Sequence, residues 1–252
     1  MAVDGFDLTG KRALVVGAET RVGRAIAGAL AEAGARLALA SSADLHGSGD
    51  DTLLSSNGSA SDLGRDSEHL TISGTADDLV RVTIEELGGL DIVANAADLK
   101  VAGPFEQLSD AAWDRLLAVN LTGPVRLFRA AGREMQARGG GKLIQVVSML
   151  GERGVPNTAA YGATQSGLLQ LIKTLSLEWA RSGIRVNGIG LGWLEGDPML
   201  GEVPDRLLRY LPTRRLGRPD EVGAIAVYLA SDDSDLMTGQ TFWVDGAVMS
   251  HA

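Results

Sequence analysis

The chain has 252 residues, of which 45% are hydrophobic and 22% charged, a composition that excludes a wholly disordered chain. Its formal net charge of −9 excludes the basic surface that nucleic acid or an anionic membrane attracts, so we expect neither partner. There are no cysteines and only three scattered histidines, so we expect no disulfide and no metal site. The first residues carry no long apolar run, which predicts a cytoplasmic soluble protein.

The first strong pattern along the chain is a β-α-β unit. Arg12–Val16 is a short apolar run typical of a buried strand, Arg24–Ala33 has helical periodicity, and Arg36–Ala40 has the pattern of a second strand. The turn after the first strand places free backbone N–H groups at a helix start, which favours a bound phosphate. Its candidate binding residues are Gly17, Thr20, Arg21, Val22 and Gly23.

Similar apolar runs recur at Leu90–Ala94, Lys142–Val147 and Ile184–Ile189, each preceded by a helix-like segment. This alternation predicts an α/β fold, a Rossmann-type doubly wound parallel sheet with helices on both faces. We expect residues 1–252 to form one domain. The segment Ser41–Glu68 breaks the regularity, and its composition fits a variable surface connection as well as a functional lid.

Two long helical patterns lie in the second half of the chain, Asp110–Arg138 with an interruption near Gly123-Pro124, and Thr158–Arg181. Each is more apolar around its circumference than a helix with one solvated face. The additional apolar side chains indicate that each helix is buried against another subunit, or that it is packed entirely inside its own domain.

Two polar side chains are expected where strands end. Asn95, with Ala96 beside it, follows the third apolar run, where small neighbours leave room for a flat ligand. Ser148 follows the strand that ends at Val147, on the carboxyl side where open α/β sheets bind ligands.

Two further side chains are expected on helices near that edge. Tyr161 opens a helix, with Asn157 or Thr158 as its N-cap, so its phenol and the Ser148 hydroxyl can converge. Asn120 lies in an amphipathic helix, where a buried amide needs a partner and could simply bend the helix.

With these residues in place, the chain resembles the short-chain dehydrogenase/reductase family over essentially its whole length. The resemblance is carried by Leu8–Lys11, Asn95-Ala96, Asn120, Ser148, Tyr161, residues 183–187 and residues 238–246. It implies an NAD(P)-dependent oxidoreductase that interconverts a carbonyl and an alcohol on a small organic substrate.

The resemblance also implies roles for single residues. The tyrosine matching Tyr161 transfers a proton to or from the substrate oxygen, the serine matching Ser148 hydrogen-bonds that oxygen, and the asparagine matching Asn120 holds a proton-relay water. Gly192 matches the glycine of a Pro-Gly pair on the cofactor side. The family further implies a homotetramer or homodimer assembled through the two long helices.

The most informative departure from the family pattern is Gln165, which stands where a lysine follows the tyrosine by four residues. The spacing keeps Gln165 on the tyrosine's helix face, where it can bond the cofactor ribose, but an amide cannot favour a phenolate as an ammonium does. Lys173 is too far along the helix, about 18 Å away, and Arg153 is a candidate replacement cation. The loss leaves two alternatives open, a non-redox lyase or dehydratase on this scaffold, and a catalytically silent binding protein.

Other departures bear on the cofactor. Arg21 stands where the family has its middle glycine, as in pteridine reductases, where such an arginine accompanies NADPH use. NAD selectivity needs an acid about 20 residues past the glycine turn, and Ser41 occupies that region, with Asp44 the nearest acid. Arg21 is suited to pair with a 2′-phosphate. We therefore expect NADP in preference to NAD.

Overall fold

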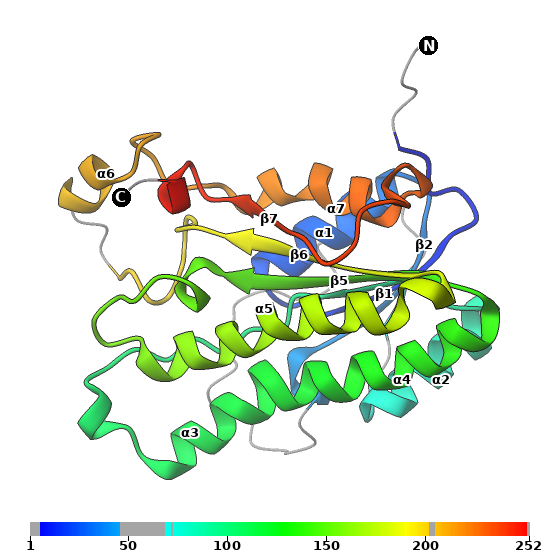
Figure 1. The fold of residues 1–252 in the computed structure, drawn as a ribbon, viewed down its shortest axis with the longest axis horizontal. Helices are drawn as coiled ribbons and strands as arrows, with labels where there is room; N and C mark the ends of the chain where they lie inside the picture. The colour runs from blue at the N-terminus through cyan, green and yellow to red at the C-terminus, as the bar shows by residue number, and fades with distance from the viewer. Residues whose placement is uncertain (1–5, 46–68, 72, 202–204, 251–252) are drawn as a thin grey trace.

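The computed structural model describes residues 6–45, 69–71, 73–201 and 205–250 (Figure 1). In these ranges seven strands pair in parallel in the order β3-β2-β1-β4-β5-β6-β7, so the predicted doubly wound sheet is confirmed. The strands are β1 (Arg12–Val16), β2 (Arg36–Ala40), β3 (His69–Thr71), β4 (Ile92–Asn95), β5 (Gly141–Ser148), β6 (Ile184–Leu191) and β7 (Thr241–Val244).

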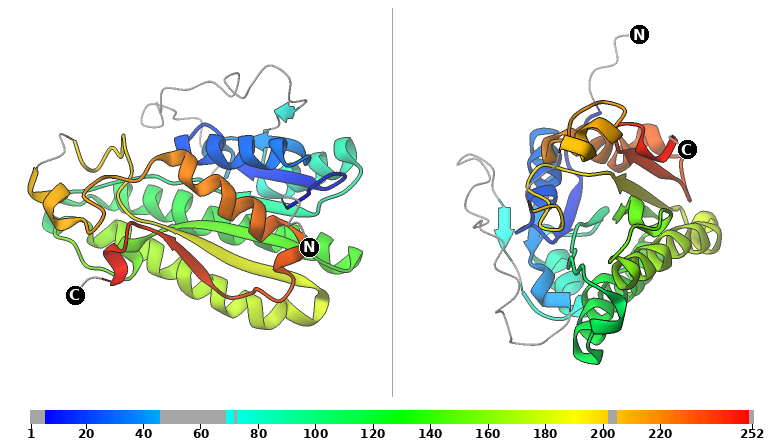
Figure 2. Two further views of the ribbon diagram at one scale, coloured as in Figure 1. Left: turned by 90° about the horizontal axis from the view of Figure 1, so that it is seen from above. Right: turned by 90° about the vertical axis from the view of Figure 1, so that its left-hand side faces the viewer.

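Helices cover both faces of the sheet, as Figure 2 shows from two further sides. One face is covered by α1 (Arg21–Glu32) and α7 (Gly223–Ala230), and the other by α2 (Ala76–Leu87), α4 (Gly123–Arg138) and α5 (Ala159–Trp179). Two shorter helices, α3 (Asp110–Leu117) and α6 (Asp205–Tyr210), complete the set in the described ranges. No helix there is long and apolar enough to cross a membrane.

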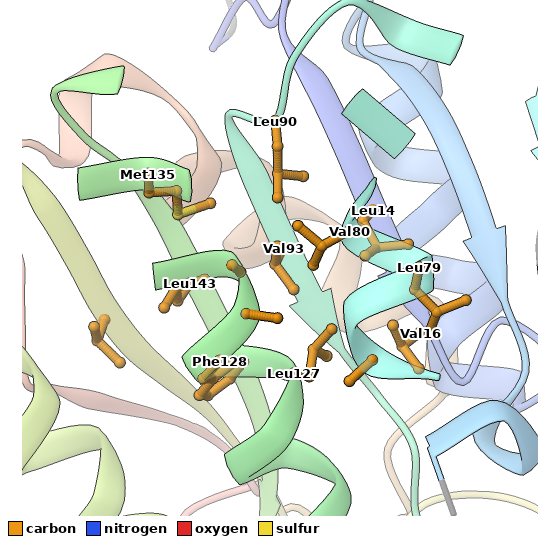
Figure 3. Packing of buried hydrophobic residues seen from close by; sticks show 14 of the residues in the cluster. Leu14, Val16, Leu79, Val80, Leu90, Val93, Leu127, Phe128, Met135 and Leu143 are labelled. Carbon is orange, nitrogen blue, oxygen red and sulfur yellow. The ribbon is translucent and has the colours of Figure 1, made fainter. Parts of the chain in front are cut away.

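Successive side chains of a strand serve opposite faces, which explains why the strands are continuously apolar. In β1, Leu14 and Val16 join the core beneath α2, α4 and α5, whereas Ala13 and Val15 join the core beneath α1 and α7. Figure 3 shows the first of these cores. Its labelled residues are Leu14, Val16, Leu79, Val80, Leu90, Val93, Leu127, Phe128, Met135 and Leu143.

The predicted helix Asp110–Arg138 is present with its interruption. A π-helical turn over Ala118–Thr122 separates α3 from α4, and the N–H of Gly123 reaches the carbonyl of Ala118. The extra residue in this turn swings Asn120 into the protein, where its side chain is fully buried. The interruption predicted near Gly123-Pro124 is therefore present as this π-helical turn.

Several local expectations need correction. Helix α1 begins at Arg21 rather than Arg24, because the Thr20 side chain caps it, and β7 was not foreseen. Neither Asn157 nor Thr158 caps α5 through its side chain, because Thr158 donates its hydroxyl to the Val155 carbonyl instead. Most of the segment 41–68, residues 46–68, lies outside the described residues.

An ion pair between Arg12 and Asp91 lies at the ends of the strands opposite the candidate site. Arg12 donates to Asp91 from Nε (2.6 Å) and Nη2 (2.7 Å), and its backbone N–H reaches the same carboxylate at 2.8 Å. Burial alone raises the pKa of Asp91, but the hydrogen bonds from Arg12 outweigh it and leave that pKa below its ordinary value. The pair thus joins β1 to the residue that precedes β4.

Replacing Asp91 by Asn should lower the free energy of unfolding at neutral pH by about 1–3 kcal/mol, the usual value of charged hydrogen bonds. Because the pKa of Asp91 is lower in the folded state, this stabilisation is present above the carboxyl's ordinary pKa and disappears as pH falls through the lowered one. Urea denaturation at fixed protein concentration, repeated from about pH 7 to pH 3, tests this. Equal stability of parent and variant at neutral pH would contradict it.

Candidate functional site

The loop of residues 17–23, called the glycine turn, lies at the carboxyl end of β1. The order of the strands reverses there, between β1 and β4. Gly17 has φ of +80°, and a Cβ there would lie 2.4 Å from the Ala97 nitrogen. A Cβ on Gly23 would lie 2.0 Å from the Gly17 carbonyl oxygen. Thr20 fixes the turn, since its hydroxyl donates to the Gly17 carbonyl (2.9 Å) and accepts from the Gly23 N–H (2.9 Å). The first turn of α1 is thereby presented at the sheet edge.

The two remaining turn residues face in different directions. Val22 packs against the core beneath α1. Arg21 is exposed, and its Nη1 reaches the Glu195 carbonyl oxygen (3.4 Å), beside Gly196 in the segment after β6. An added Cβ on Gly196 would lie 2.0 Å from that guanidinium. Arg21 therefore extends toward the segment after β6.

Glu19 is a turn residue that the sequence analysis missed. Its Oε1 accepts the backbone N–H of Ser42 at the end of β2 (2.9 Å). Its Oε2 and the Ser42 hydroxyl are buried without a hydrogen-bond partner among the described residues. The neighbouring Ser41 hydroxyl accepts the Ala43 N–H (3.1 Å). Polar groups left unsatisfied at this place fit a ligand that carries hydroxyl donors.

Three other predicted cofactor residues shape the same edge. Asn95 donates to the Gln145 side chain (2.9 Å) and accepts the Ala97 N–H (3.3 Å), so it holds the chain that follows β4 against the glycine turn. Ala96 donates its N–H to the Val16 carbonyl (2.8 Å). Gly192 lies so close to β7 that a Cβ would stand 2.7 Å from the Asp245 Cα.

Asn120 clamps the loop that follows β4. Its Oδ1 accepts the Leu99 N–H (2.7 Å) and its Nδ2 donates to the Leu99 carbonyl (2.8 Å). The two polar atoms of one side-chain amide thus satisfy both backbone groups of the buried Leu99, which fixes the residues on either side of it. Those neighbours are Asp98 and Lys100.

Ser148, the last residue of β5, is connected to α5. Its backbone N–H is accepted by Gln165 Oε1 (2.9 Å), and its hydroxyl accepts the Leu150 N–H (3.2 Å). A hydrogen bond from the same hydroxyl to Tyr161 lowers the pKa of that phenol, although burial outweighs this effect. Ser148, Tyr161 and Gln165 are therefore brought together as predicted, and Gln165 holds the Ser148 backbone.

The partner of Tyr161 is an acid that the sequence analysis did not identify. Tyr161 is 1% exposed, and its Oη donates to Asp98 Oδ2 at 2.9 Å. Burial raises the pKa of Tyr161 well above its ordinary value, and the Asp98 carboxylate raises it further. Arg153 does not replace the missing lysine here: its guanidinium donates to the Val248 carbonyl and lies over the Tyr210 ring.

The cation beside this pair is Lys100. Its Nζ lies 3.9 Å from Asp98 Oδ2 and 2.5 Å from Asp197 Oδ2, in the segment after β6. Burial raises the pKa of Asp98, and Lys100 partly offsets the increase. The set formed by Tyr161, Asp98, Lys100 and Asp197 is called the proton cluster below.

The described residues therefore bring together the glycine turn, a pair of side-chain hydroxyls and a buried acid along one sheet edge. Figure 1 shows α6 and the segment after β6 at the end to which the arrows of β5 and β6 point. Residues of that segment, with Leu211 and Leu216, form an apolar cluster with Tyr161. This arrangement suits proton exchange with a small hydroxylated molecule close to a bound dinucleotide.

Comparison with known proteins agrees with this geometry. Residues 17–248 match the family model described as Enoyl-(Acyl carrier protein) reductase. D-threitol dehydrogenase of Mycolicibacterium smegmatis is 34% identical over 253 residues, which cover 96% of this chain and 94% of that protein. The chain belongs to the short-chain dehydrogenase/reductase family.

Two further relatives act on sugar acids by name. The 2-dehydro-3-deoxy-D-gluconate 5-dehydrogenase of Pseudoalteromonas atlantica is 34% identical, with 97% of this chain and 98% of the relative covered. The gluconate 5-dehydrogenase of Burkholderia cenocepacia, solved with NADP and tartrate, has a TM-score of 0.83 at 28% identity over 100% of both chains. The protein is thus an oxidoreductase that interconverts an alcohol and a carbonyl on a small substrate with a nicotinamide cofactor.

The residues present fit such a cofactor. The glycine turn leaves space that a Cβ would fill, and Glu19 and Ser42 offer unsatisfied polar atoms at the end of β2. When bound, the nicotinamide supplies the hydride acceptor or donor.

Proposed function

We propose that this short-chain dehydrogenase acts on a secondary alcohol of a polyol or a sugar acid, and that Tyr161 exchanges the hydroxyl proton while Ser148 orients the oxygen. The observation that carries the proposal is that Ser148 ends β5 and is joined by Gln165 to the helix that carries Tyr161, at the sheet edge that also holds the glycine turn. The named activities of the relatives support the substrate class.

Asn120 has a positioning role in this proposal. The family places a proton-relay water at the matching asparagine. Here both polar atoms of the Asn120 side chain are hydrogen-bonded to the Leu99 backbone. Asn120 therefore holds the loop that carries Asp98 and Lys100. Gln165 likewise holds Ser148 in line with Tyr161.

We propose a cofactor preference that differs from the one expected from the sequence. That expectation combined the Ser41 hydroxyl, which does not repel a 2′-phosphate, with pairing of Arg21, whose guanidinium extends toward Glu195. The end of β2, where the adenosine ribose binds in this fold, instead faces the Glu19 carboxylate. A carboxylate accepts hydrogen bonds from ribose hydroxyls and repels a phosphate, so the proposed cofactor is NAD, selected by Glu19.

Assembly into a homodimer or homotetramer through α4 and α5 is part of the proposal. Helix α5 buries one face against the sheet and leaves Leu177 82% exposed on the other. Val125 of α4 is also exposed, and the two helices meet where Trp179 lies over Gly132. Exposed apolar side chains on adjacent helices suit a two-fold interface.

With threitol, sorbitol and gluconate as test substrates, the parent protein should reduce NAD with at least one of them. Tyr161→Phe should lower kcat by about 10²-fold or more, because it removes the proton-exchanging group, and should leave NADH affinity within about twofold. Absorbance at the NADH band measures turnover, and fluorescence titration measures binding. A Tyr161→Phe protein with parental kcat would refute the role of Tyr161.

For cofactor choice, the parent should bind NADH more tightly than NADPH. Glu19→Gln keeps an acceptor for the Ser42 N–H but removes the charge, so it should improve NADPH affinity relative to NADH by about tenfold, or roughly 1.4 kcal/mol. Arg21→Ala serves as the matched control and should not improve NADPH affinity relative to NADH affinity. Calorimetric titration of both nucleotides tests the assignment, which tighter NADPH binding by the parent would contradict.

Sedimentation at micromolar concentration should give a mass of two or four times 26.3 kDa. Leu177→Glu places a charge in the proposed interface and should lower that mass without unfolding the chain. Leu236→Glu, the same change at a leucine that is 94% exposed outside α4 and α5, is the control and should matter less. A parent protein that sediments as a single chain would rule the assembly out.

A further inference from the structure

We propose that Asp98 is the acceptor of the proton that Tyr161 releases during alcohol oxidation, so that tyrosine and aspartate together replace the family's tyrosine and lysine. This inference rests on the proposed function and goes beyond it, because Asp98 is not among the residues that carry the family resemblance.

The hydrogen bond between Tyr161 and Asp98 defines the direction of transfer. The phenol donates to Asp98 Oδ2 at 2.9 Å, so its proton already points at a carboxylate. The other carboxylate oxygen, Oδ1, is buried and has no hydrogen-bond partner among the described residues. An acid with one unsatisfied buried oxygen gains by accepting a proton, because neutralisation removes the cost of burying its charge.

The replacement of lysine by Gln165 makes such an acceptor necessary. With a lysine beside it, a tyrosine can rest as a phenolate and take the substrate proton directly. Here Gln165 carries no charge and is bonded to the Ser148 backbone. Burial and the Asp98 charge hold the pKa of Tyr161 far above neutrality. Tyr161 therefore rests as a neutral phenol, which accepts a proton only if it gives its own away.

The transfer balances as follows. As the carbonyl forms, the electron pair of the substrate C–H bond would leave as hydride, which a bound nicotinamide would accept. The substrate O–H proton passes to Tyr161 Oη, and the Tyr161 proton passes to Asp98 Oδ2. One alcohol and one carboxylate become one carbonyl and one carboxylic acid, and the reduction direction reverses each transfer.

The surrounding charges suit this assignment. The charged groups that face Asp98 are Lys100 of its own loop and Asp197 of the segment after β6. With both acids ionised the proton cluster carries one net negative charge, and protonation of Asp98 leaves it neutral. The Asp98 side chain is 25% exposed, so water can remove the proton after turnover.

The test compares Asp98→Asn with Asp197→Asn, which removes one negative charge beside the same lysine without touching Tyr161. Asp98→Asn should lower kcat for alcohol oxidation by about 10²-fold or more at neutral pH, with KM changed far less. Asp197→Asn should lower kcat by less than about tenfold.

The pH dependence of the rate should separate a proton acceptor from a nearby charge. Parental oxidation should rise with pH as Asp98 ionises and then level off, whereas Asp98→Asn should keep rising into the alkaline range, where only tyrosinate accepts the proton.

A second readout needs neither cofactor nor turnover. The chain has three tyrosines, so subtracting the ultraviolet titration of Tyr161→Phe isolates the ionisation of Tyr161. In Asp98→Asn this ionisation should begin at lower pH than in the parent, because a negative charge beside the phenol is gone. If Tyr161 ionised at the same pH in Asp98→Asn as in the parent, the contact between Tyr161 and Asp98 would be wrong. Parental kcat and pH profile in Asp98→Asn would overturn the proton acceptor alone, whereas a parent without any nicotinamide turnover would overturn the proposed function and the acceptor's catalytic role with it.

Discussion

The position of β4 between β1 and β5 is the constraint on which this site depends. The register pairs Val16 with Asn95, and Asn95 with Gln145, so three strands end at one edge. Because Gly17 has no side chain, the glycine turn can approach the peptide between Ala96 and Ala97. Every functional group described above projects from this edge or from a helix that begins beside it.

Much of this architecture could be predicted from the sequence, because it follows from local patterns. The apolar runs gave the buried strands, and serine after a strand with tyrosine at a helix start placed Ser148 and Tyr161 correctly. The short strand β7 escaped because its four residues carry too weak a pattern. Its place in the sheet depends on pairing with β6 across about 50 residues of chain.

The two acids of the proposed site, Asp98 and Glu19, could not be predicted from local sequence patterns. Asp98 lies in an irregular loop, and its importance comes from Tyr161, 63 residues away in sequence. Glu19 escaped for a different reason: the search for a ribose-binding acid followed the end of β2, whereas the carboxylate reaches that place from the preceding turn. Tertiary packing thus supplied both groups where sequence spacing indicated none.

The proton cluster shows how a charge can be relocated without losing the chemistry. A lysine beside a tyrosine stabilises negative charge on the phenolic oxygen. In this chain the negative charge rests on Asp98, one hydrogen bond away, and Lys100 stands beside that acid. The phenol then passes a proton between the substrate and Asp98, which requires that the substrate, Tyr161 and Asp98 are accurately aligned. The amides of Asn120 and Gln165 supply that alignment by bonding the adjacent backbone.

The segment after β6 contacts both halves of the site within three residues. Arg21 of the glycine turn reaches the Glu195 carbonyl, and Lys100 of the proton cluster binds Asp197. A ligand that moves residues 195–197 therefore acts on the glycine turn and on the proton cluster together. If cofactor and substrate each move this segment, linkage requires that each changes the binding affinity of the other by the same factor. Residues 195–197 are thus the segment through which binding in one half of the site can change binding in the other.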